Sequence, residues 1–73
     1  MRTYDVYRRK ILVARVRLLD SGKIEWAYRH RKSGWQSFWW SNDVKLTMEQ
    51  FIQQYPELEE LVVSEFTIRR RRN

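Results

Sequence analysis

Hydrophobic and polar residues alternate along much of the first half of the chain, which is the pattern of β-strands that bury one face. Between residues 11 and 40 the apolar positions recur at every second residue in three separate runs. The residues on this apolar parity are Leu12, Ala14, Val16, Leu18, Ile24, Trp26, Tyr28, Phe38 and Trp40. The pattern predicts a small antiparallel sheet with one face toward a core.

Three strands account for this alternation. The first is expected to run from Tyr4 to Leu19, with a bend or bulge near residues 8–10, where the alternation is weakest. The second is expected over Lys23–Arg31 and the third over Trp35–Ser41. Together they predict a three-stranded antiparallel meander.

Two loops of similar sequence, at residues 20–22 and 32–34, separate these strands, and each ends in Gly. Three-residue hairpin loops favour Gly at the position that needs a left-handed backbone. With such a loop, Arg17 lies opposite Glu25, and apolar residues lie opposite apolar ones on the other face. A slip of one residue would mix charged and apolar side chains on both faces. Two three-residue-loop hairpins are therefore predicted.

A helix is expected after the third strand. Thr47, followed by Gln50 three residues later, matches a capping box and predicts the helix N-terminus. One apolar stripe at helical spacing follows, formed by Met48, Phe51, Ile52 and Tyr55. Pro56 is expected to end the helix or to start a short new turn at residues 57–60. We expect the stripe to cover the apolar face of the sheet.

A fourth strand is expected over Leu61–Arg70, with no partner strand that the sequence identifies. The fold class predicted is therefore α+β: a three-stranded antiparallel meander packed on one helix, with a fourth, C-terminal strand. The 73 residues are expected to form a single small domain, 1–73, in which residues 69–73 are a flexible basic tail.

The amino-acid composition excludes some kinds of stabilising cross-link and argues against a membrane protein. It has no cysteine, so disulfides and thiolate metal sites are excluded, and 4 Trp, 4 Tyr and 3 Phe supply large side chains for a small core. No stretch approaches the ~20 apolar residues of a membrane span, and the N-terminus lacks the apolar region of a signal peptide. We expect a cytoplasmic protein with no membrane partner.

The charge is unevenly distributed along the chain. Residues 1–42 hold ten Lys and Arg against three Asp and Glu, a net charge of +7. Residues 43–65 hold one Lys against six Asp and Glu, a net charge of −5, and the four arginines of residues 66–73 add +4. A strongly basic segment indicates an acidic partner, such as nucleic acid.

The polar parity of the predicted sheet combines basic and aromatic side chains. Its candidate binding residues are Arg15, Arg17, Arg29, Arg31, Trp35 and Trp39. Arginine contacts phosphates, and exposed tryptophan stacks on unpaired bases. The alternatives are an ordinary charged surface for the arginines, and for Trp39 either cover by the N-terminal segment or a dimer contact. For Trp35, which is next to a turn, the alternative is a cap on the edge of the sheet.

The C-terminal arginines add a second basic group to the candidate binding residues: Arg69, Arg70, Arg71 and Arg72. They could form an arm that grips a nucleic-acid backbone, or a solubilising end. The chain has one histidine, no nucleophile motif, no phosphate-binding loop and no zinc-ligand cluster, so we expect neither an enzyme nor a cofactor.

The order of elements over residues 11–55 resembles that of the small DNA-binding domains of some plant transcription factors and phage-type integrases. The resemblance is one of architecture, and it implies a three-stranded sheet laid in the major groove. The hypothesis from the sequence is thus a nucleic-acid-binding protein, with duplex DNA slightly favoured. One alternative is a protein-binding module or inhibitor, such as a small phage-encoded one, that uses the same face on an acidic protein. The other is a homodimer.

Overall fold

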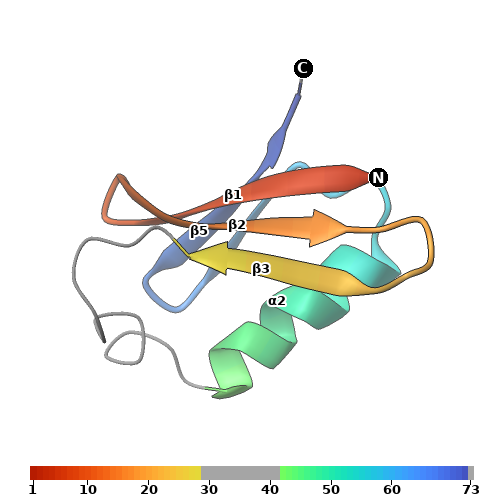
Figure 1. Ribbon diagram of the computed structural model, residues 1–73. Helices are drawn as coiled ribbons and strands as arrows, with labels where there is room; N and C mark the ends of the chain where they lie inside the picture. The colour runs from red at the N-terminus through yellow and green to blue at the C-terminus, as the bar shows by residue number, and fades with distance from the viewer. Residues whose placement is uncertain (29–41, 73) are drawn as a thin grey trace.

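The computed structural model describes residues 1–28 and 42–72, which form a five-stranded antiparallel sheet and one helix (Figure 1). The strands are ordered β3-β2-β1-β5-β4. In chain order the elements are β1 (Arg2–Arg8), β2 (Ile11–Leu18), β3 (Ile24–Tyr28), α2 (Asn42–Gln54), β4 (Glu60–Val63) and β5 (Phe66–Arg71). The predicted α+β class is confirmed, but the described sheet has five strands where four were expected.

The N-terminal segment is a hairpin, and the prediction of one long strand from Tyr4 to Leu19 was wrong. β1 and β2 pair antiparallel through a two-residue turn, Arg9 and Lys10, whose φ angles are 51° and 68°. Tight hairpins place both central residues in this left-handed region and usually use Asn-Gly there. Because Arg-Lys carries no such signal, the sequence showed only weakened alternation at the turn.

The β2–β3 hairpin has the predicted three-residue loop and register. Leu19 and Lys23 close the loop through a backbone hydrogen bond of 2.9 Å, and Gly22 has a φ of 90°. Arg17 pairs with Glu25 across the two strands. The second predicted hairpin, including the loop at 32–34 and the strand over Trp35–Ser41, lies outside the described residues.

The last strand prediction was wrong in a similar way, because residues 60–71 also form a hairpin. β4 and β5 are joined by a two-residue turn at Ser64, whose φ is 57°, and Glu65. β5 then pairs with β1 and occupies the place between β1 and β4. Residues 69–71, expected in a flexible tail, are held by the backbone hydrogen bonds of this strand.

Helix α2 begins at Asn42, five residues before the predicted N-cap. Thr47 lies inside the helix, where its hydroxyl donates to the carbonyl of Asp43 at 2.8 Å. This bond to the preceding turn is the usual alternative for a helical threonine. The capping-box prediction was therefore wrong, although Asp43 provides the favourable acidic charge in the first turn.

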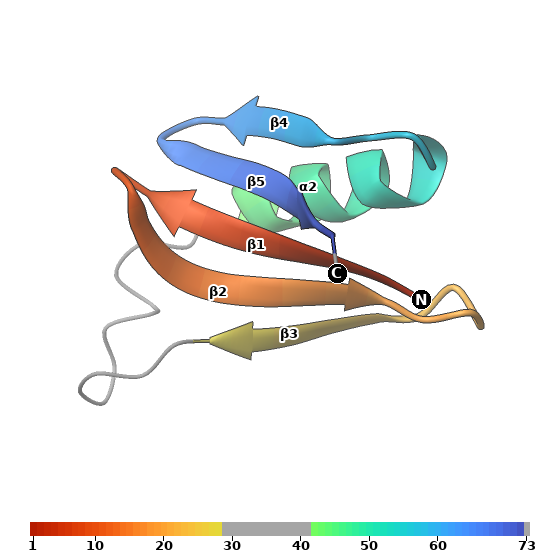
Figure 2. The same cartoon turned by 90° about the horizontal axis from the view of Figure 1, so that it is seen from above.

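The core lies between α2 and one face of the sheet, and Figure 2 shows the helix behind the strands on that side. Of the predicted stripe, Met48 and Ile52 are fully buried, Phe51 is half-buried and Tyr55 is exposed. The other fully buried side chains come from three adjacent strands: Tyr4, Val6, Val13, Ala14, Val16, Phe66 and Ile68. Each large one contributes about 1.5–3 kcal/mol to folding. No element that the structure describes packs on the opposite face of the sheet.

Candidate nucleic-acid interface

The sheet face opposite α2, here called the open face, is not covered by any element that the structure describes (Figure 2). The strand registers and the alternation of side chains give its members. They are Glu25 and Ala27 of β3, Leu12, Arg15 and Arg17 of β2, Thr3, Asp5 and Tyr7 of β1, Thr67, Arg69 and Arg71 of β5, and Glu60 and Val62 of β4. The prediction that Leu12 faces the core was wrong, because a bulge in the β1–β2 pair buries Val13 and places Leu12 opposite Tyr7.

Four arginines stand in two cross-strand rows at the centre of the open face. In one row Arg17 and Arg71 flank Thr3 on β1, and in the other Arg15 and Arg69 flank Asp5. Neighbouring strands are about 4.8 Å apart, so β2 and β5 are separated by roughly 10 Å. The fold thus joins arginines from two distant parts of the sequence in one group.

Asp5 is the most buried charged residue of this face, with 8% of its surface exposed. Its Oδ1 accepts a hydrogen bond of 3.0 Å from Nε of Arg15, and its Oδ2 lies 3.4 Å from Nη1 of Arg71. The side chains of Arg15 and Arg71 remain 37% and 47% exposed. The carboxylate therefore lies beneath two guanidinium groups that solvent can reach.

The other two arginines of the face have different surroundings. Arg69 donates from Nε to Glu60 at 3.0 Å, and its guanidinium carbon lies 5.8 Å from the ring centre of Tyr7. Arg17 is exposed, and its side chain makes no hydrogen bond or ion pair with residues 1–28 or 42–72. It is the arginine of this face most available to a ligand.

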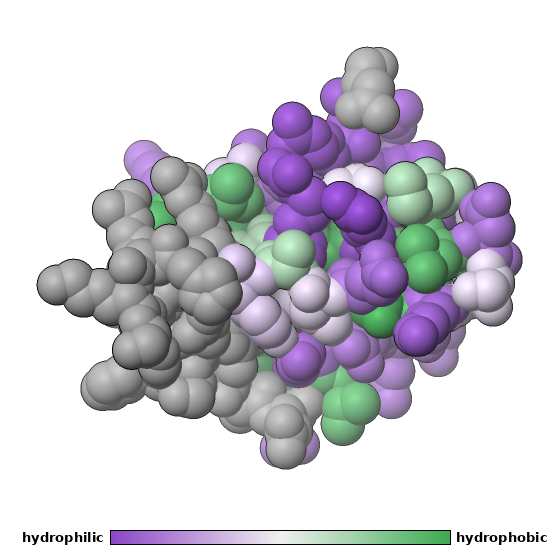
Figure 3. Space-filling view, in the orientation of Figure 1, coloured by the Kyte–Doolittle hydropathy of each residue, from purple (hydrophilic) through white to green (hydrophobic). Residues whose placement is uncertain are grey.

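A hollow of about 400 Å³ opens beside these arginines, over β2 and β3. Arg15, Arg17, Glu25 and Ala27 are among the residues that line it. Ala27 pairs with Arg15, and its small side chain leaves the surface low at that point. Figure 3 shows hydrophilic side chains gathered over the middle of the described surface, with apolar ones in separate patches.

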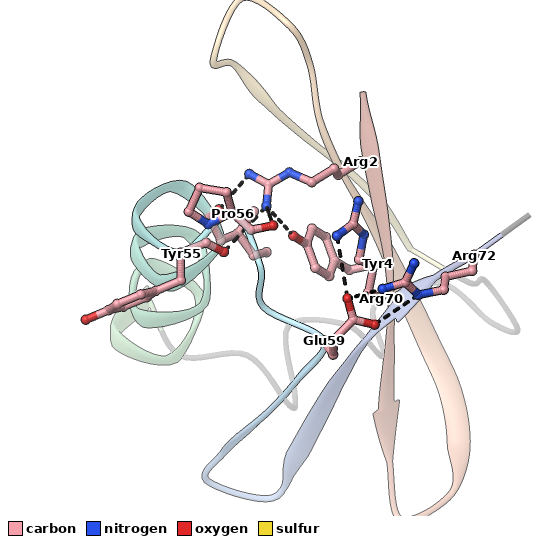
Figure 4. A network of polar contacts seen from close by, with 8 residues as sticks. Arg2, Tyr4, Tyr55, Pro56, Glu59, Arg70 and Arg72 are labelled. Atoms are coloured by element: carbon pink, nitrogen blue, oxygen red, sulfur yellow. Dashed lines mark hydrogen bonds and ion pairs between the residues drawn. The ribbon is translucent and has the colours of Figure 1, made fainter.

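Arg70 and Arg72 do not belong to the open face. Arg70 pairs with the buried Tyr4, and Nη1 of Arg70 lies 3.5 Å from Oε2 of Glu59. Arg72 also binds Glu59, with 3.0 Å between its Nε and Oε1 (Figure 4). The hydrogen bond from Arg72 is the main reason why the pKa of Glu59 is lowered. These two arginines therefore hold the β4–β5 end together.

Ten binding residues were predicted from the sequence, and the structure brings four of them together on the open face. These are Arg15, Arg17, Arg69 and Arg71. Arg29, Arg31, Trp35 and Trp39 lie outside the described residues. Thr3, Asp5 and Tyr7 were not predicted, because they belong to a strand whose end the sequence pattern did not reveal. Their alternation with Tyr4 and Val6 was a usable signal.

The charge of the open face is complementary to anionic ligands. Its four arginines exceed its three carboxylates, Asp5, Glu25 and Glu60, and nothing in residues 1–28 or 42–72 groups three metal-ligating side chains. No helix in this part of the chain is long and apolar enough to cross a membrane. Comparison of the chain with protein-family models, curated proteins and solved structures gave no match.

Proposed function

We propose that this protein binds single-stranded nucleic acid across the open face of its sheet. The observation that carries the proposal is the group of four arginines from β2 and β5 on a surface that no described element covers. Arginines neutralise backbone phosphates, and the net charge of +6 adds a long-range attraction for polyanions.

The width of the sheet supports a single strand over the duplex that the sequence favoured slightly. Five strands spaced about 4.8 Å apart span roughly 19 Å. The major groove of DNA is only about 12 Å wide and admits a two-stranded ribbon. The four arginines lie on β2 and β5, with β3 and β4 outside them, so the sheet cannot bring them to the floor of a groove.

Unpaired nucleic acid does not impose this limit, because its backbone can lie across a broad surface while its bases contact hollows and rings. Tyr7 places one aromatic ring on the open face, beside Arg69. The hollow over Ala27 offers a place for a planar group next to Arg15 and Arg17. The face therefore combines cations for a backbone with surfaces for bases.

A second candidate function is supported by the carboxylates of the same face. Asp5, Glu25 and Glu60 alternate with the arginines, which gives a mixed pattern of charge. Protein interfaces use such complementary charges to select one partner. A protein-binding module or inhibitor that acts through the open face is thus the alternative.

Fluorescence anisotropy tests the first proposal. Labelled single-stranded DNA, single-stranded RNA and duplex DNA of one sequence are titrated with the protein at several salt concentrations. We expect the single strands to bind more tightly than the duplex, with log K falling by about 0.7 per unit of log salt for each phosphate contacted. Absence of binding to all three at low salt would refute the proposal. Purification from native lysate, with and without nuclease, then tests the protein partner.

A further inference from the structure

We propose that Arg15, Arg17 and Arg71 together hold one phosphate group of the ligand, and that Asp5 is the positioning residue of this subsite. The inference rests on the proposed function, because it names the part of the open face that takes the backbone. It assigns a favourable role in binding to an acidic residue, although its negative charge by itself repels a phosphate.

Arg15 and Arg71 keep N–H donors that their contacts with Asp5 do not use. A guanidinium group has five N–H donors. Arg15 uses Nε on Asp5, which leaves both of its Nη atoms, and Arg71 uses Nη1, which leaves Nε and Nη2. Phosphate oxygens accept from such paired donors in a fork geometry. The two arginines can therefore bind Asp5 and an anion simultaneously.

The position of Asp5 argues against its being a competitor that a phosphate displaces. Only 8% of the residue is exposed, whereas both arginines are exposed by more than a third of their side chains. A phosphate that arrives from solvent thus meets the guanidinium groups first and finds the carboxylate beneath them. Asp5 also offsets the repulsion between two neighbouring cations.

The third arginine completes the subsite. Arg17 is two residues from Arg15 on the same strand face, and it stands in the same cross-strand row as Arg71. Thr3 lies between Arg17 and Arg71 on β1 and is half-buried. Since Arg17 has no ion pair within the described residues, all of its donors are available to the same phosphate.

Two mechanisms predict opposite signs for Asp5→Asn. If the carboxylate acts only through its charge, its removal makes the face more basic and tightens binding. If Asp5 positions Arg15 and Arg71, its removal frees two long side chains that must then be ordered by the ligand. On the positioning model we expect single-stranded DNA to bind the variant at least about fivefold more weakly than wild type. We also expect a shallower salt dependence.

The matched control is Glu65→Gln, which removes one negative charge at the β4–β5 turn, where Glu65 pairs with Arg8 at 2.6 Å. This variant is expected to bind single-stranded DNA as tightly as wild type or slightly more tightly. Urea unfolding confirms that both variants are folded at the temperature of the titration. Tighter binding by Asp5→Asn than by wild type would overturn the positioning role.

A measurement on the wild-type protein separates this inference from the proposed function. In NMR spectra we expect sodium pyrophosphate to shift the side-chain Nε–H signals of Arg15, Arg17 and Arg71, while that of Arg8 stays in place. Such shifts without binding of any oligonucleotide would support the phosphate subsite and refute the nucleic-acid function. Oligonucleotide binding without these shifts would overturn the subsite and leave the function standing. The same measurement decides the matter if Asp5→Asn does not fold.

Discussion

The guanidinium of Arg2 donates a hydrogen bond of 3.1 Å to the backbone carbonyl of Ile52, which joins the start of β1 to the last turn of α2. A second bond, of 2.7 Å, reaches the carbonyl of Pro56, and a third, of 3.0 Å, reaches the hydroxyl of Tyr4 (Figure 4). The last carbonyls of a helix lack partners within the helix, and a cation there also suits the helix dipole. Arg2 therefore acts as a C-terminal cap supplied by another element.

Replacement of this cap is expected to destabilise the fold. Arg2→Ala should lower the free energy of unfolding by about 1.5–3 kcal/mol, the usual contribution of hydrogen bonds to a charged group. Arg2→Lys should lower the free energy of unfolding by less, because lysine keeps the positive charge. Some loss should remain, because lysine lacks the planar fork of donors. Urea unfolding measures both. Lys23→Ala, a change at an exposed side chain, should stay within about 0.5 kcal/mol of wild type. An equally small effect of Arg2→Ala would mean that the cap contributes nothing.

The turn between β1 and β2 can be improved. Arg9 and Lys10 both hold left-handed backbone angles that ordinary side chains adopt at a cost. Arg9→Asn combined with Lys10→Gly should therefore raise the free energy of unfolding by about 1 kcal/mol. Gly22→Ala should have the opposite effect, a loss of about 1 kcal/mol, because the φ of Gly22 is 90° although open space surrounds it. Thermal unfolding should show a raised melting temperature for the first variant and a lowered one for the second.

Acid is expected to weaken the β4–β5 end through Glu59. The hydrogen bond from Arg72 and the charges of Arg72 and Arg70 hold the pKa of Glu59 below its ordinary value of 4.5. In the unfolded chain the carboxyl regains that ordinary value, so it binds protons there first as the pH falls. The stabilisation is thus complete above pH 4.5 and is lost as the pH falls through the lower pKa of the folded state.

Unfolding measured between about pH 6 and pH 3 tests this linkage. Glu59→Gln should flatten the loss of stability in the acid range. The control is Glu57→Gln, at an exposed carboxylate with no ion pair in the described part of the chain, and it should follow the wild-type curve. Identical curves for the two variants would contradict a role for the Glu59 pairs.

The open face makes a quantitative prediction about salt. Arg17→Ala combined with Arg69→Ala removes two cations of the face, and each phosphate contact with a single strand contributes about 0.7 to the salt slope. Arg69→Ala removes one such contact, whereas the phosphate shared with Arg17 keeps Arg15 and Arg71, so the slope should become shallower by about 0.7. Lys45→Gln removes a cation on the helix side, near Trp26, and should leave the slope unchanged. Anisotropy titrations with single-stranded DNA measure all three proteins.

Local sequence was sufficient where the interacting residues are close along the chain. The β2–β3 register followed from alternation and from Gly22, because a slip would have placed Glu25 among apolar residues. The burial of Met48 and Ile52 followed from their helical spacing. The turns at Arg9 and at Ser64 contain no glycine, so the sequence did not predict the two hairpins or the strand boundaries there.

Only the tertiary structure decided which strands are neighbours. Alternation assigns Arg71 to one face of its own strand, but backbone hydrogen bonds are alike for every strand pair and do not encode a partner. β5 pairs with β1 because the apolar residues Ile68 and Val6 meet over the core, and this contact brings Arg71 to Asp5. The sequence by itself thus determined the kinds of side chain on each strand face. Long-range packing determined that arginines from the two ends of the chain share one surface.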